Sequence, residues 1–140
     1  MPMIDVTAAV GTFQDKPALI KALAEAIMRW EQVPPIDYFS ENTAAFVHEL
    51  PNDAISNAKG ESNYVRINVL TPVGVLDRDE QLGVVGEMTE IVSAAAGDPT
   101  LAERTWVLIS EAPDGGWGID GHAYLNAEIA DTARRILGGG

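Results

Sequence analysis

The chain repeats one pattern of residues twice. The dipeptide Val10-Gly11 recurs 63 positions later as Val73-Gly74. A second echo follows in each half at nearly the same spacing, FVHELPND at residues 46–53 and LISEAPDG at residues 108–115. Two echoes in the same order predict a duplicated supersecondary unit. Whatever fold the chain adopts must therefore accommodate two similar halves.

Each half has the pattern of a strand, a helix and a second strand. The first copy covers about residues 2–51, with strands expected at 3–9 and 43–50 around a helix at 16–32. Asp15 is placed to cap that helix. Apolar residues at helical spacing predict one buried stripe. This stripe consists of Leu19, Ile20, Leu23, Ile27 and Trp30.

The second copy covers about residues 64–113, with strands expected at 64–70 and 106–110. Its helix begins after the capping pair formed by Asp77 and Glu80 and ends at Gly97. The predicted apolar stripe of this helix consists of Leu82, Val85, Met88, Val92 and Ala95. The tail, about residues 123–137, is expected to be helical.

Two β-α-β units predict an α/β (α+β) fold, a four-stranded mixed sheet with both helices on one face. At 140 residues we expect a single domain over residues 1–140. The opposite face of the sheet then lacks a cover within the chain. Oligomerisation is the most economical way to bury it.

Composition restricts the partners and the compartment. The 21 acidic and 9 basic residues give a net charge of −12, which disfavours nucleic acid and anionic membranes. The sequence contains neither an apolar run of membrane-spanning length nor a signal-peptide pattern, so a cytoplasmic protein is expected. There is no cysteine, no metal-binding cluster and no phosphate-loop spacing. We therefore predict that no metal or cofactor is required.

Three segments carry a family resemblance. The start PMIDVTAAVGTFQDK (residues 2–16), the turn VPPIDY (33–38) and the end TWVLISEAPDGGWGIDGH (105–122) resemble the tautomerase superfamily. The resemblance implies a homotrimer of double β-α-β subunits with a catalytic proline on the first strand. It also implies a keto–enol tautomerase that acts on a small carbonyl or enol substrate. Pro2 is the matching residue, exposed as the N-terminus once Met1 is removed.

An N-terminal proline suits this chemistry for physical reasons. Its secondary amine is a backbone nitrogen able to act as a base, with a reference pKa of about 7.7–8.0 that burial lowers. A base poised near neutral pH efficiently removes a proton next to a carbonyl. If Met1 stays, Pro2 is a tertiary amide without a basic lone pair.

Other polar residues are candidates for assisting Pro2. Asp37 matches a functional aspartate in the resembling turn, although an aspartate there also commonly caps a turn. Arg29 is a candidate for binding a substrate carboxylate, or it only complements the helix dipole. His48 is a candidate substrate contact, or a structural histidine.

The expected pocket is aromatic rather than cationic. Trp106 and Trp117 are candidate pocket walls, or core and interface aromatics. The loop at residues 72–76 lacks the arginines that hold carboxylates in the dehalogenase and decarboxylase branches, and Arg78 follows only beyond it. Trp106 stands where 4-oxalocrotonate tautomerase has an arginine. These departures favour a larger and more apolar enol or keto substrate.

Other functions stay open at this point. Within the same superfamily, the alternatives are a decarboxylase and a hydratase or dehalogenase. A binding or signalling protein could keep the fold without turnover. A ferredoxin-like dimeric binding domain, with an accidental Pro2, also fits two β-α-β units.

Overall fold

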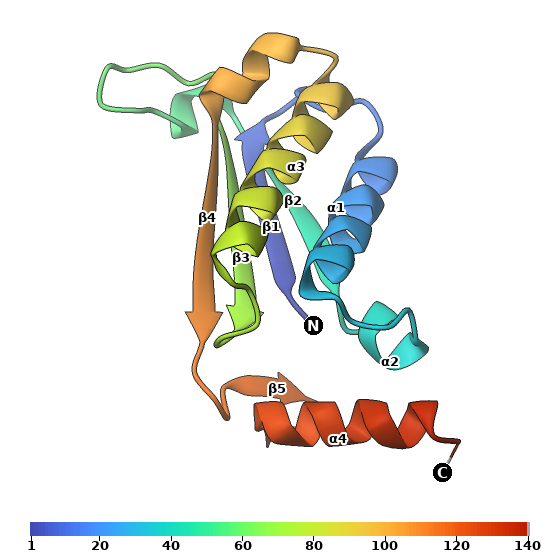
Figure 1. Ribbon diagram of the computed structural model, residues 1–140. Helices are drawn as coiled ribbons and strands as arrows, with labels where there is room; N and C mark the ends of the chain where they lie inside the picture. Colours follow the sequence, from blue (N-terminus) through green and yellow to red (C-terminus); the bar gives the residue numbers. More distant parts are fainter. Residues whose placement is uncertain (140) are drawn as a thin grey trace.

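The computed structural model describes residues 1–139 and contains both predicted β-α-β units (Figure 1). The elements of these units are β1 (Met3–Ala9), α1 (Lys16–Glu31), β2 (Ala44–Leu50), β3 (Val65–Pro72), α3 (Arg78–Ala96) and β4 (Thr105–Ala112). Local signals start and stop the helices. Asp15 and Asp77 accept hydrogen bonds from the first turns of α1 and α3, and Gly97 ends α3 in the left-handed conformation.

The four strands form one sheet in the order β2-β1-β3-β4. β1 is parallel to β2, β3 is parallel to β4, and the central pair β1 and β3 is antiparallel. The mixed sheet predicted from the duplication is therefore confirmed. Met3 pairs with Leu70, and Leu70 with Ser110, so the start of β1 lies near the carboxyl ends of β3 and β4.

Several elements lie outside the repeat. They are the short helix α2 (Asp37–Ser40), two 3₁₀ turns (Asn52–Ala54 and Pro99–Arg104), the hairpin strands β5 (Trp117–Ile119) and β6 (His122–Tyr124), and α4 (Asn126–Leu137). The last helix agrees with the predicted helical tail, but the hairpin before it was not predicted. Asp120 and Gly121 form its two-residue turn, both with positive φ.

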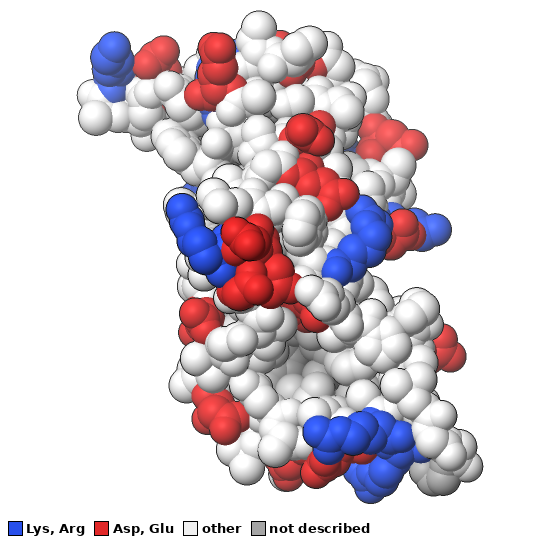
Figure 2. Space-filling view, in the orientation of Figure 1, with Lys and Arg blue, Asp and Glu red and all other residues white. Residues whose placement is uncertain are grey.

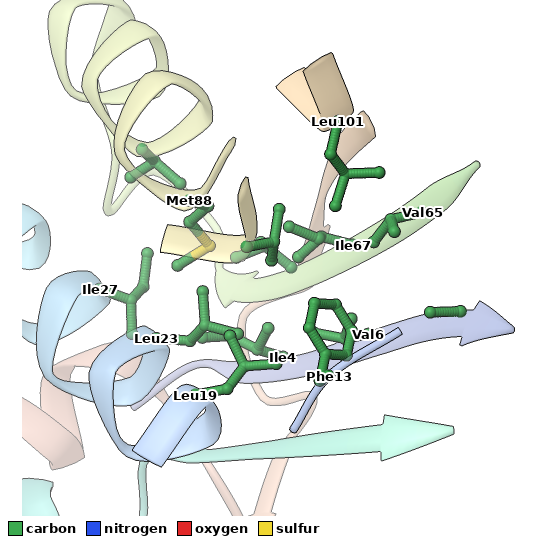
Figure 3. Close-up of a cluster of buried hydrophobic side chains, with 14 residues drawn as sticks. Ile4, Val6, Phe13, Leu19, Leu23, Ile27, Val65, Ile67, Met88 and Leu101 are labelled. Atoms are coloured by element: carbon green, nitrogen blue, oxygen red, sulfur yellow. The ribbon is translucent and has the colours of Figure 1, made fainter. Parts of the chain in front are cut away.

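Helices α1 and α3 cover the same face of the sheet and enclose the main core, part of which Figure 3 shows. On α1, the predicted residues Leu19, Leu23 and Ile27 are buried, whereas Ile20 and Trp30 are only half-buried. The continuous row that faces the sheet therefore runs on to Glu31, a charged residue.

The predicted stripe of α3 is partly wrong. Met88 and Val92 are buried as expected, but Val84 takes the place of Leu82 and Val85, which are exposed. Val84, Met88 and Val92 recur every fourth residue, which makes them one ridge on the helix. The sequence offered two overlapping apolar rows, and packing against the sheet selected this one.

Helices α1 and α3 contact each other closely at Gly83. A Cβ atom on Gly83 would lie 2.1 Å from Cη2 of Trp30, too close for the indole to stay in place. Trp30 Nε1 also donates a hydrogen bond to Glu87 Oε2 at 2.6 Å, which fixes the ring across α3. The helix pair thus depends on a glycine that helix propensity alone disfavours.

We expect Gly83→Ala to lower the free energy of unfolding by about 1–3 kcal/mol, because the added methyl overpacks the Trp30 contact. Gly86→Ala is the matched control, since a Cβ there meets nothing within 4 Å on the same helix. That control should raise stability by up to about 1 kcal/mol through helix propensity. Urea unfolding of both variants measures the difference. Equal stability of the two variants would contradict the contact.

The sheet face opposite the helices carries exposed apolar side chains. These are Phe46, Leu70, Trp106 and Leu108. Side chains alternate along a strand, and the intervening residues Val107 and Ile109 pack on the helix side. Within the described chain, no helix is both long and apolar enough to cross a membrane.

Candidate functional site

The N-terminus is buried rather than free. Met1 is only 2% exposed and Pro2 is fully buried at the start of β1. Figure 1 places this end of the chain between the sheet and α4. Met1 belongs to a second apolar cluster, here called the N-terminal cluster. Its buried members are Met1, Phe39, Ala112, Trp117, Ile129 and Ala133.

Most of the N-terminal cluster comes from elements outside the two β-α-β units. Phe39 comes from α2, Trp117 from β5, and Ile129 and Ala133 from one side of α4. Asn126 at the start of α4 donates a hydrogen bond to the Val73 carbonyl at 3.1 Å, which ties α4 to the loop after β3. In the space-filling view the surface is hollowed between the main body and α4 (Figure 2).

A buried carboxylate lies beside the N-terminal amine. Glu31 Oε1 accepts a hydrogen bond from the Met1 amine at 3.0 Å, and both side chains are almost completely inaccessible. Burial raises the pKa of the Glu31 carboxyl above its ordinary value, and the positive amine opposes that shift. Glu31 Oε2 is buried with no hydrogen-bond partner among residues 1–139. Glu31 Oε2 is thus an acceptor that no group among residues 1–139 uses.

A buried hydroxyl contributes to the same region. Tyr38 packs against the N-terminal cluster, and its Oη atom is buried. Burial raises the pKa of Tyr38, while the nearby Thr132 hydroxyl on α4 offsets part of the shift without a hydrogen bond of good geometry. Tyr38 Oη is thus a neutral donor between the N-terminal cluster and the polar side chains of α4. Perturbed groups of this kind concentrate at functional sites.

The structure brings two of the predicted site residues together. Trp117 is a member of the N-terminal cluster with 6% of its surface exposed, and the buried Pro2 stands in sequence between Met1, another member, and Met3, which packs against the cluster. Asp37 is the first residue of α2 and is exposed to solvent. It is next to Tyr38 in sequence but is not among the residues of the N-terminal cluster.

Three predicted residues lie elsewhere in the subunit. Arg29 forms an ion pair with Glu87 of α3 at 2.8 Å on the outside of the helix layer. His48 Nε2 lies 2.7 Å from Asp5 Oδ1 on the outer face of the sheet. Trp106 stacks on Tyr64, with ring centroids 4.5 Å apart, and is paired with β3 far from Pro72. Within one subunit, none of the three reaches the N-terminus.

Sequence reasoning missed Glu31 and Tyr38. A signal for Glu31 was present, because Leu23, Ile27 and Glu31 recur every fourth residue along the buried side of α1. A glutamate that continues an apolar row is a buried charge in need of a partner. For Tyr38, no comparable pattern existed. Across residues 1–139, three or more His, Asp or Glu side chains nowhere gather into a group suited to a metal ion.

The sequence and the structure were compared with those of known proteins. No family model and no curated protein matches the sequence. Among solved structures, a fused 4-OT in a symmetric trimer is similar at 18% identity and TM-score 0.70, covering 86% of this chain and 93% of that one. Pt0534 inactivated by 2-oxo-3-pentynoate is similar at 16% identity and TM-score 0.75, covering 90% and 98%.

A third similar structure is N1, a member of the cis-3-chloroacrylic acid dehalogenase family. It has 16% identity and TM-score 0.74, with coverage of 94% of this chain and 90% of that one. These structural neighbours are members of the tautomerase superfamily. The chain therefore has the tautomerase fold, as the sequence motifs predicted. At these identities the likeness establishes the fold and not the reaction.

Proposed function

We propose that this protein is a cofactor-independent tautomerase in which the amine of Pro2, freed by removal of Met1, acts as general base. The observation that carries the proposal is the buried N-terminus, with its amine 3.0 Å from the buried Glu31 carboxylate. Chain termini usually lie exposed at the surface. Burying an amine and a carboxylate together costs desolvation free energy, so a buried ion pair is weak evidence for stability. We therefore assign it a role in function.

The reaction follows from the groups at this site. The lone pair of Pro2 removes a proton from the carbon next to a carbonyl, and the electrons of that C–H bond form the enolate. We assign the Tyr38 hydroxyl, buried without a hydrogen-bond partner among residues 1–139, as the donor to the developing oxyanion. The protonated amine then returns the proton to the other end of the enolate. Pro2, Tyr38 and the N-terminal cluster thus supply a base, a donor and apolar walls.

We infer the substrate class from the apolar residues of the N-terminal cluster. The N-terminal cluster contains Phe39, Trp117 and Ile129, apolar surroundings that suit a flat apolar or aromatic carbonyl compound. The nearest cation to Tyr38 is Arg135 on α4, an exposed side chain at the rim. We therefore propose arylpyruvate-like keto and enol forms before small carboxylates.

We also propose that the active form is a homotrimer. The apolar outer sheet face needs a cover, and the symmetric trimer of a fused 4-OT with this fold offers one arrangement. His48 and Trp106 lie on that outer face and would be buried by such an assembly. Their role as substrate contacts would then depend on a neighbouring subunit.

An ultraviolet keto–enol assay with phenylpyruvate tests the proposal. We expect turnover by protein that begins at Pro2, and Pro2→Ala should retain only weak activity because it keeps a primary amine. Treatment with 2-oxo-3-pentynoate should add one adduct to the N-terminal peptide, measured by mass spectrometry. Absence of turnover together with absence of labelling would reject the proposed function and favour a binding protein.

A further inference from the structure

We propose that Glu31 is a positioning residue for the N-terminal amine, which it holds by a hydrogen bond. This inference rests on the proposed function, because it assigns Glu31 to the amine that the function uses. Glu31 is the last residue of α1, so a rigid helix supports its carboxylate. It contacts the terminus across 30 positions of sequence, which only tertiary folding can arrange.

The geometry persists when Met1 is removed. Pro2 follows Met1 by one residue, or about 3.8 Å between Cα atoms, and Pro2 is itself fully buried. Its amine therefore begins within a residue's length of the Met1 nitrogen that now binds Glu31 Oε1. The carboxylate reaches that distance directly or through one bridging water.

The second oxygen of Glu31 gives an independent argument. Oε2 is buried and unpartnered within residues 1–139 while Oε1 carries the whole contact with the amine. Gln32, the next residue, donates its own side-chain hydrogen bond to Glu80 Oε2 instead. A buried polar atom that the fold leaves unsatisfied is costly. An ammonium N–H or a substrate hydroxyl at the terminus is the partner that we assign to it.

The charges around Glu31 are few. Two charged groups act on Glu31, namely the N-terminal amine and Glu80 of α3. The Tyr38 hydroxyl of α2 is neutral, and the charges of α4 that act on it are Glu128 and Arg135. Glu31 is thus the buried anion beside the amine. A carboxylate at hydrogen-bond distance orients the amine and interacts favourably with its protonated form.

The test is the pH dependence of the amine in Glu31→Gln, which keeps the size of the side chain and removes its charge. We expect the acidic limb of the kcat/KM profile to move to lower pH, because a neutral amide no longer interacts favourably with the protonated amine. Glu25→Gln is the matched control, because Glu25 lies on the exposed side of the same helix. The control profile should coincide with that of the unmodified protein.

A second measurement needs no turnover. The rate at which an alkylating reagent modifies the N-terminal amine is followed by intact mass as a function of pH, and its midpoint should shift in the same direction in Glu31→Gln. Glu31→Asp keeps the charge but moves it farther from the amine. The midpoint of its alkylation profile should therefore lie between those of the unmodified protein and Glu31→Gln. It also replaces Glu31→Gln if that variant fails to fold.

The two proposals fail in different ways. If the protein has no tautomerase activity but the alkylation midpoint still shifts in Glu31→Gln, the function is wrong and the role of Glu31 stands. If turnover depends on Pro2 while Glu31→Gln leaves the pH profile and the midpoint unchanged, the function stands and Glu31 has no role in positioning the amine.

Discussion

Protein that keeps Met1 is expected to turn over its substrate about 10²- to 10⁴-fold more slowly than protein that begins at Pro2, the range that a general base contributes. Two physical effects act together. The Pro2 nitrogen becomes an amide without a basic lone pair, and the Met1 side chain occupies the N-terminal cluster, where it is 2% exposed. A substrate of any size must displace it.

The comparison uses two forms of the same chain. A cleavable N-terminal fusion is cut to leave either Pro2 or Met1 at the terminus, and intact mass confirms each product. Circular dichroism controls for folding, and the phenylpyruvate assay gives kcat/KM for both. Equal turnover of the two forms would end the proline mechanism, and Asp37 or His48 would become the next candidates for the base.

The second large effect concerns assembly. We expect Leu108→Asp to convert the proposed trimer into monomers, because it places a charge on the exposed apolar sheet face, on the edge strand β4. Leu82→Asp is the matched control. Leu82 is 56% exposed and Leu108 is 51% exposed, but Leu82 lies on α3 on the other side of the molecule. The same substitution at an equally exposed leucine should leave the trimer intact.

Light scattering at micromolar concentration measures both variants and the unmodified protein. Circular dichroism distinguishes lost assembly from lost fold, since aspartate also disfavours a strand. A monomer before any substitution would show that the sheet face is not a subunit interface. A trimer in Leu108→Asp would place the interface elsewhere on the surface.

The sequence by itself determined the two β-α-β units, because their signals are local. Period-two and helical spacing, the Asp77–Glu80 capping pair and Gly97 at the end of α3 act over a few residues and do not depend on the rest of the fold. Pro2 was also visible, as the residue just before the first strand in a chain that resembles tautomerases. The Asp120-Gly121 dipeptide is also a local signal for a hairpin turn, although the hairpin was not predicted from it.

Tertiary structure alone decided the site around Pro2. Met1, Glu31 and Trp117 come from three distant segments, and no local pattern states which of them meet. Trp106 and Trp117 look alike in sequence, yet one lies on the outer sheet face and the other in the N-terminal cluster. Likewise α3 carried two apolar rows, and burial selected Val84 over Leu82. Periodicity shows that a helix has an apolar side, but only packing against distant strands determines which side is buried.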